Sequence, residues 1–170
     1  MHLKTLRYLA SSGWLEPLPA AMDSAQTLVI AFGASAFAEQ AAPFAELRAA
    51  FPQAVLAGCS TSGEIAGAQV YDSSISVAVV RFARTTLRRA LAEVPAPQDS
   101  WQVGARLARA LDGPGLRAVF VLSDGLHVNG TSLVAGLTQN LPAGVSVAGG
   151  LAGDGDRFGR TWVLDDAQPV

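Results

Sequence analysis

Four short apolar runs, each closed by glycine or by a polar loop, are typical of buried β-strands. They are Thr27–Phe32, Ala54–Gly58, Arg117–Gly125 and Val145–Gly150. Thr161–Leu164 has the same character over a shorter length and predicts another strand. Residues 1–26 show no sustained hydrophobic period, so we interpret them as a lead-in to the domain that follows.

Three segments between these runs carry apolar residues at the spacing of one helical face. The first lies between the first two strands and contains Pro43, which must either kink the helix or begin its second part. Its apolar positions are Phe37, Phe44, Leu47 and Phe51. The second helix is expected to begin at Asp99 or Ser100 and to end at Leu111, and the third covers Thr131–Asn140.

One further apolar stretch introduces antiparallel pairing. Ser74–Phe82 approaches a continuous strand, and Thr86–Val94 is a second strand-like stretch after the short connection Arg84-Thr85. This spacing predicts an antiparallel hairpin. Strands alternating with helices, with that hairpin between them, predict an α/β fold in which helices cover a mixed β-sheet. We expect this domain to occupy residues 27–170.

The composition narrows the classes of function. The 170 residues are 50% hydrophobic and only 15% charged, which excludes an intrinsically disordered chain. A net charge of −2 gives no general attraction to phosphate backbones, so no nucleic-acid partner is expected. One cysteine and two distant histidines exclude a disulfide framework and a multi-ligand metal site. No run of about 20 apolar residues and no secretory signal is present, so we expect a cytoplasmic protein without a membrane partner.

Three loops that follow expected strands concentrate small polar residues. They are Gly58–Glu64, Ser123–Gly130 and Gly149–Asp156. Ligands of open α/β sheets bind outside the carboxyl ends of parallel strands. Glycines at such ends allow close approach of the backbone, and hydroxyl and carboxylate groups supply oriented hydrogen bonds. We therefore predict that the three loops meet around a single ligand pocket.

Several of these residues have competing interpretations. Thr61 and Glu64 fit a capping box at the start of a helix. Cys59 and Ser60 form a near miss to a nucleophile elbow, but no complete catalytic set accompanies them, so we expect no enzyme. His127 is interpreted as a loop residue satisfied by backbone, as a proton-sensitive ligand contact, or as an axial haem ligand.

Three ordered motifs together resemble the amino-terminal FIST domain. They are GCSTSGEI (58–65), VFVLSDGLHVNGTSLVAGL (119–137) and VAGGLAGDGDRFGRTWVL (147–164). The resemblance implies a bacterial intracellular sensory module for small ligands, with amino acids as one proposed class. It also implies signalling partners such as histidine kinases or cyclic-diguanylate enzymes, and a haem-binding, nitric oxide-sensing subset. Family members usually continue into a carboxyl-terminal FIST half, so we interpret this chain as a candidate fragment.

The motif positions are our candidate ligand-binding residues. They are Ser60, Thr61, Ser62, Glu64, Asp124, His127, Asn129, Gly149, Gly150 and Asp154. The leading hypothesis is a noncatalytic sensor of a small ligand, without a cofactor. The alternatives are a nitric oxide sensor that binds haem noncovalently through His127, and a hydrolase that uses Ser60 or Cys59.

Overall fold

The chain divides into two units in a computed structural model that describes residues 1–170. The first, which we call the sheet unit, combines Met1–Leu87 with Ala152–Val170. The second, which we call the inserted unit, comprises Arg88–Leu151. Each unit has its own cluster of buried apolar side chains, so each can be described by itself.

The sheet unit is built on a five-stranded mixed sheet with the strand order β2-β1-β7-β3-β4. Strand β7 pairs antiparallel with both β1 and β3, whereas β3 and β4 are parallel. The strands are β1 (His2–Leu9), β2 (Gly13–Trp14), β3 (Thr27–Ala34), β4 (Val55–Thr61) and β7 (Ser74–Arg81).

A crossover from β3 to β4 supplies the main core of this unit. It contains the 3-10 turn η2 (Ser35–Glu39) and helix α1 (Ala42–Ala50), and a shorter 3-10 turn, η1 (Ala20–Met22), precedes β3. Pro43 lies in the first turn of α1, where its missing N–H has no intrahelical partner to lose. The apolar side chains predicted to share a face, Phe37, Phe44, Leu47 and Phe51, are each at most 1% exposed.

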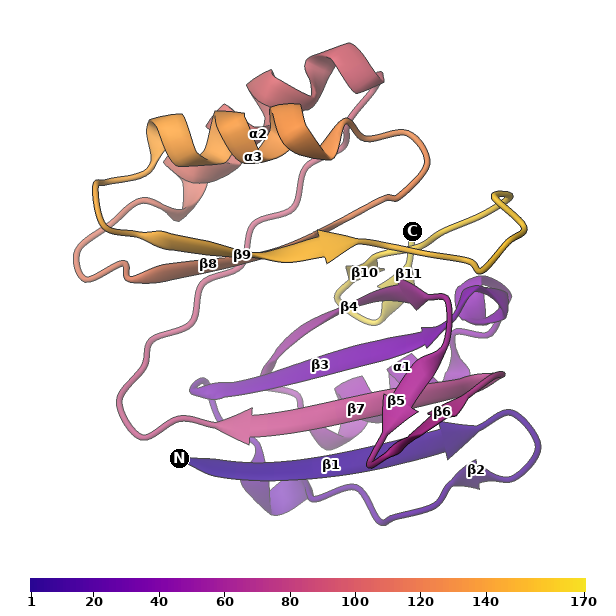
Figure 1. Cartoon of the computed structure of the whole chain (residues 1–170). Coiled ribbons are helices and arrows are strands. Elements are labelled where there is room, and N and C mark those ends of the chain that lie inside the picture. Colours follow the sequence, from indigo (N-terminus) through magenta and orange to yellow (C-terminus); the bar gives the residue numbers. More distant parts are fainter. The chain divides into compact units, whose positions relative to one another are not determined.

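Two short hairpins complete the sheet unit. Strands β5 (Glu64–Ala66) and β6 (Gln69–Tyr71) form one hairpin, and β10 (Leu164–Asp165) and β11 (Gln168–Pro169) form the other. Figure 1 shows α1 behind the five-stranded sheet and the β5–β6 hairpin in front of it. The two faces of the sheet are therefore covered by different elements.

The inserted unit is a two-layer arrangement of helices on a small parallel sheet. Helices α2 and α3 lie on one face of the paired strands β8 and β9 (Figure 1). The elements are η3 (Pro97–Asp99), α2 (Ser100–Leu111), β8 (Ala118–Ser123), α3 (Gly130–Asn140) and β9 (Ser146–Leu151). Because β8 and β9 are parallel, α3 is the crossover that joins them.

Two glycines allow α2 and α3 to approach closely. A Cβ atom added at Gly136 would lie 2.1 Å from the carbonyl oxygen of Trp101, and one added at Gly104 would lie 2.3 Å from that of Leu133. Neither position has room for a methyl group, since the neighbouring atoms belong to backbone. The helix pair thus depends on the smallest side chain at both contacts.

The mixed α/β architecture predicted from the sequence is confirmed, as are the strands and helices around most apolar runs. The hairpin predicted from Ser74–Phe82 and Thr86–Val94 is wrong, because no strand forms between β7 and α2. The apolar residues Ala92 and Val94 of that stretch pack against the core of the inserted unit without forming a strand. Only Leu164 of the expected strand Thr161–Leu164 lies in a strand.

The interpretation of residues 1–26 as a lead-in also needs correction. Strand β1 pairs along its whole length with β7, from His2 opposite Arg81 to Leu9 opposite Ser74. Its side chain Leu6 is buried in the core. Only one face of β1 packs on the core, and its other face carries polar residues. The strand therefore has no sustained hydrophobic period that would predict its pairing.

We expect Gly136→Ala to destabilise the inserted unit. Alanine normally favours a helix over glycine by about 1 kcal/mol. Here the added methyl must displace the backbone of α2, and overpacking of this kind costs about 1–3 kcal/mol. Urea unfolding followed by circular dichroism measures the change. Thr138→Ala, at an exposed position of the same helix, is the control and should be nearly neutral; a Gly136→Ala variant as stable as the control would contradict the close contact.

Candidate functional site

The first polar segment, Gly58–Glu64, and residues 152–156 of the third lie together in the sheet unit. The end of β4 pairs with the returning segment that begins at Ala152, because the Gly153 N–H donates to the carbonyl of Ser60 at 2.9 Å. The Gly155 N–H donates to Ser62 Oγ at 3.0 Å. The carbonyl of Trp162 accepts from the Ser60 N–H at 2.9 Å, and the Trp162 N–H donates to Ser60 Oγ at 3.1 Å. The polar atoms of this cluster are therefore used to join two distant chain segments.

Glu64 is the buried carboxylate of this cluster, with 2% of its surface exposed. Its Oε1 accepts from Thr61 Oγ1 at 2.9 Å, and its Oε2 accepts from the Ser74 hydroxyl at 2.8 Å and from the Ser74 N–H at 3.3 Å. Burial raises the pKa of Glu64, and the hydrogen bonds from Ser74 and Thr61 offset part of that rise. No helix follows Thr61, so the capping-box prediction is wrong. The two residues instead connect β4, β5 and β7.

Asp154 organises the loop that follows it. Its Oδ2 accepts from the Gly159 N–H at 2.7 Å and from the Arg160 N–H at 2.9 Å. Backbone hydrogen bonds from Arg160 and Gly159 lower the pKa of Asp154, because they stabilise the ionised form. The carboxylate is 4% exposed, and both bonds hold the loop back upon itself.

The two nucleophile candidates are enclosed in the same region. Cys59 is 2% exposed, and burial raises the pKa of its thiol to about 11, so the thiolate is scarce at neutral pH. Ser60 is fully buried, and its Oγ is occupied by the Trp162 N–H. The hydrolase hypothesis gains no support from this geometry.

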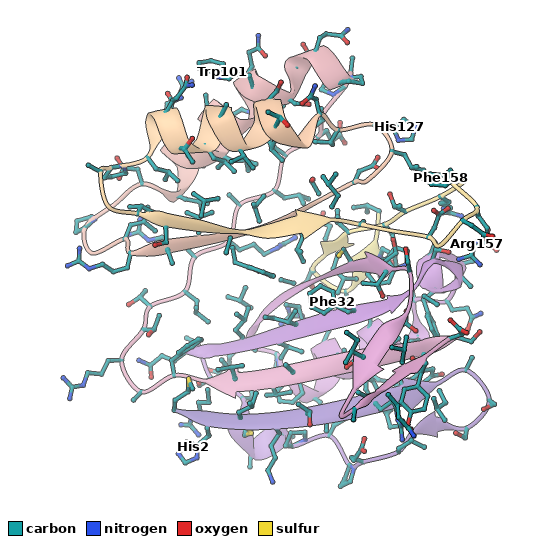
Figure 2. All side chains as sticks on the ribbon, in the orientation of Figure 1. His2, Phe32, Trp101, His127, Arg157 and Phe158 are labelled. Atoms are coloured by element: carbon teal, nitrogen blue, oxygen red, sulfur yellow. The ribbon has the colours of Figure 1, made fainter.

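The second polar loop belongs to the inserted unit and follows β8. Asp124 Oδ1 accepts from the Leu126 N–H at 2.6 Å and from the His127 N–H at 3.4 Å. Its Oδ2 lies 2.8 Å from His127 Nδ1, which fixes the ring orientation. The His127 side chain projects from this loop and is 73% exposed (Figure 2). Asp124 thus folds the loop and orients the histidine.

Asn129 ends the loop by capping α3. Its side-chain oxygen accepts from the Ser132 N–H at 3.0 Å, which satisfies a free donor of the first helical turn. Its own N–H donates to Ser100 Oγ of α2 at 3.0 Å. Asn129 is therefore the N-cap residue of α3.

Gly149 and Gly150 lie in β9 and have different roles. A Cβ atom at Gly149 would lie 1.7 Å from the carbonyl oxygen of Val121, the residue paired with it in β8. Gly149 also has a φ of 150°, a conformation that side chains rarely adopt. Gly150 has open space where a side chain would be. The first glycine is required by the strand pair, and the second leaves the backbone accessible.

A hollow of about 630 Å³ opens beside these glycines, and every residue that lines it belongs to the inserted unit. We call it the apolar hollow. Its lining residues are Val121, Ser123, Gly130, Thr131, Leu133, Val134, Val147, Ala148, Gly149, Gly150 and Leu151. It runs along β9 from Val147 to Leu151, reaches the carboxyl ends of the two parallel strands at Ser123 and Leu151, and lies beside the first turns of α3. Its volume falls within the range of small-molecule sites, and most of its walls are hydrocarbon.

The structure therefore divides the candidate residues into two groups. Ser60, Thr61, Ser62, Glu64 and Asp154 belong to the sheet unit. Asp124, His127, Asn129, Gly149 and Gly150 belong to the inserted unit. The first loop meets residues 152–156 of the third within the sheet unit, whereas convergence of all three loops stays a prediction.

Only Gly149 and Gly150 among the candidates line the apolar hollow. The apolar walls, such as Leu133 and Val147, and the hydroxyl-bearing residues Ser123 and Thr131 were not among the predicted ligand contacts. The position of the last two could have indicated them, because Ser123 ends one strand and Thr131 lies in the first turn of the next helix.

The chain matches the FIST N domain family over residues 27–170 and belongs to that family. The FIST domain is a sensory domain implicated in small-ligand binding in signalling. No curated protein and no solved structure matches the chain. None of its helices combines the length and the apolar composition needed to cross a bilayer.

We expect Glu64→Gln to remove one pH-dependent contribution to stability. The native pKa of Glu64 lies above its ordinary value of 4.5, so the native state binds the proton more tightly than the unfolded chain does. The contribution is complete below about pH 4.5 and is lost as the pH rises through the native pKa. A glutamine can donate from Nε2 to Thr61 and accept from Ser74, which imitates the protonated form.

Urea unfolding between pH 4.5 and 7.5 measures this effect. The free energy of unfolding of the variant should rise relative to that of the unmodified protein as the pH increases through this range. Glu39→Gln is the matched control, since Glu39 is 80% exposed and pairs with Arg160 at the surface. Parallel pH profiles for the Glu64→Gln variant and the unmodified protein would show that burial does not perturb this carboxyl.

Proposed function

We propose that this chain is a noncatalytic sensory domain that binds a small ligand in the apolar hollow of the inserted unit. Membership of the FIST family supports the sensory function. The observation that carries the choice of site is the hollow itself, at the carboxyl ends of β8 and β9. Parallel strands joined by a crossover helix bind ligands at this end, where the loops diverge.

The walls of the hollow favour a ligand with a hydrocarbon body. Val134 and Leu151 line it and remain 43% and 52% exposed. A ligand that covered them would gain about 25 cal/mol for each Å² of apolar surface removed from water. The hydroxyls of Ser123 and Thr131 can bind one polar end. Within the amino acid class, branched or aromatic members match this distribution best.

The polar candidates of the sheet unit have another role in this proposal. Ser60, Glu64 and Asp154 are buried and already hydrogen-bonded within the fold. A ligand would have to displace those internal bonds, and an unpaired buried donor or acceptor costs about 1–3 kcal/mol. We therefore propose that these three residues stabilise the fold, and that the ligand contacts the residues that line the apolar hollow.

A sensor must couple binding to a change that a partner can detect. A ligand shifts an equilibrium only if it binds one conformation more tightly than the other. Residues of β8, α3 and β9 line the apolar hollow. The Asp124–Asn129 loop beside it is held by side-chain hydrogen bonds of Asp124 and Asn129. We propose that this loop changes on binding, and that the readers are cytoplasmic signalling proteins such as histidine kinases or cyclic-diguanylate enzymes in a bacterium.

Haem binding through His127 is the second candidate, and one contact favours it. Ligand histidines usually donate their other ring nitrogen to a carboxylate, as the Asp124 contact with His127 Nδ1 allows. The exposure of His127 does not fit an axial haem ligand, because such a histidine lies in an apolar pocket and this side chain is 73% exposed. A Soret band that disappears in His127→Ala would establish this candidate, and the absence of such a band would overturn it.

The ligand proposal is tested by filling the hollow. Val134→Phe places a larger side chain at an exposed position on its wall, whereas Thr138→Phe, one turn further along α3, lies outside the lining. The probes are leucine, isoleucine, valine and phenylalanine, together with the carboxylic acids that lack their amino groups. At 100 times Kd, a bound compound should stabilise the protein by about 2.7 kcal/mol, seen as a rise in Tm.

We expect at least one probe to raise the Tm of the unmodified protein and of Thr138→Phe, but not that of Val134→Phe. Two results would contradict the proposal. One is a Tm that no probe changes, and the other is an equal rise in Val134→Phe, which would move the site away from the hollow.

A further inference from the structure

A second hollow, of about 310 Å³, lies in the sheet unit against the β5–β6 hairpin. We call it the Arg7 hollow. It lies on the face of β1 and β7 opposite α1, where Ser76 Oγ donates to the carbonyl of Ile65 at 2.8 Å. Its polar lining residues are Thr5, Arg7, Glu16, Tyr71 and Ser76. Of its lining residues only Ile65 belongs to a FIST motif, and nothing in the ligand proposal above depends on this hollow.

Arg7 is held in this hollow without a partner for its charge. The guanidinium carbon lies 4.2 Å from the centroid of the Tyr71 ring, in a cation–π contact. Its Nε is buried and makes no hydrogen bond, and the guanidinium is in no ion pair. A buried donor without an acceptor is rare in folded proteins, because it loses its bonds to water without replacement. The stacked guanidinium is therefore fixed in position and lacks an acceptor.

Glu16 lies on the same hollow and does not supply that acceptor. Its Oε2 accepts from the backbone N–H of Arg7 at 2.8 Å, so the carboxylate is bound to the main chain and not to the guanidinium. The hollow thus presents a fixed cation and a separate fixed anion. A ligand with two negative charges would be repelled by Glu16, whereas one with a single carboxylate and a donor group would satisfy both.

We propose that the Arg7 hollow binds a small monocarboxylate that carries a hydrogen-bond donor at its other end. The carboxylate would accept from the guanidinium, whose planar N–H groups match its two oxygens. The donor end would face Glu16, and Thr5 and Ser76 line the same hollow. The contact with the Tyr71 ring restrains the guanidinium, which lowers the entropy lost on binding.

The site is tested with three probes that differ in charge. They are 4-aminobutyrate, which has both ends, butyrate, which has the carboxylate alone, and inorganic phosphate. Calorimetric titration should give the tightest binding for 4-aminobutyrate and the weakest for phosphate. The side-chain Nε–H resonance of Arg7 should shift on addition of 4-aminobutyrate, a change that a purely structural arginine would not show.

Two substitutions and one control complete the test. Arg7→Gln should weaken binding of 4-aminobutyrate at least about tenfold, as expected for loss of a charged hydrogen-bond pair. Glu16→Gln, whose amide oxygen can still accept from the Arg7 N–H, should reduce the preference over phosphate. Arg81→Gln removes an exposed arginine of the same sheet that is outside the lining, and should leave binding unchanged.

Equal weakening by Arg7→Gln and Arg81→Gln would overturn the proposal, since only general charge would then matter. An unmoved Arg7 Nε–H resonance would overturn it as well. Val134→Phe separates this site from the apolar hollow, because it should leave binding of 4-aminobutyrate unchanged whether or not the hollow binds its own ligand.

Discussion

The attachment of residues 152–170 to β4 determines how the rest of the structure is organised. Trp162 is 1% exposed in the main core, its backbone exchanges hydrogen bonds with Ser60, and its Nε1 donates to the carbonyl of Ala34 at 3.2 Å. These bonds attach residues 152–170 to strands formed more than a hundred positions earlier. Residues 88–151 thereby become an insertion with both ends tied to one unit.

That attachment explains the structural role of the polar motifs. Small side chains at the end of β4 let the returning backbone approach, and a Cβ at Gly153 would lie 2.6 Å from Ser62 Oγ. Asp154 then shapes the loop, and Glu64 ties β5 to β7. Ser60, Glu64 and Asp154, which were predicted as ligand contacts, use their side chains in hydrogen bonds within the fold. The apolar hollow lies beside β9, where glycine and hydrocarbon side chains leave space unfilled.

The sequence predicted the buried strands and amphipathic helices well, because burial on one or both faces leaves a local pattern. It did not predict β1, whose pairing with β7 spans more than sixty residues and whose outer face carries polar side chains such as Arg7. It mistook Thr86–Val94 for a strand, since apolar packing without pairing has the same composition. The loop after β8 was located correctly, whereas Gly58–Thr61 belongs to β4 and Gly149–Leu151 belongs to β9, so those predicted loops begin too early. The internal hydrogen bonds of the polar segments, as at Asp154, depend on partners that only the fold brings together.

We propose that the apolar hollow, and not the buried polar cluster, receives the sensory ligand. Backbone amide chemical shifts, recorded while the hydrocarbon amino acids and their deaminated acids are titrated, test it directly. The account predicts that the largest changes fall on Thr131, Gly149, Gly150 and Leu151. Changes concentrated on Ser60, Ser62 and Glu64, or none at the hollow with any of these compounds, would contradict it.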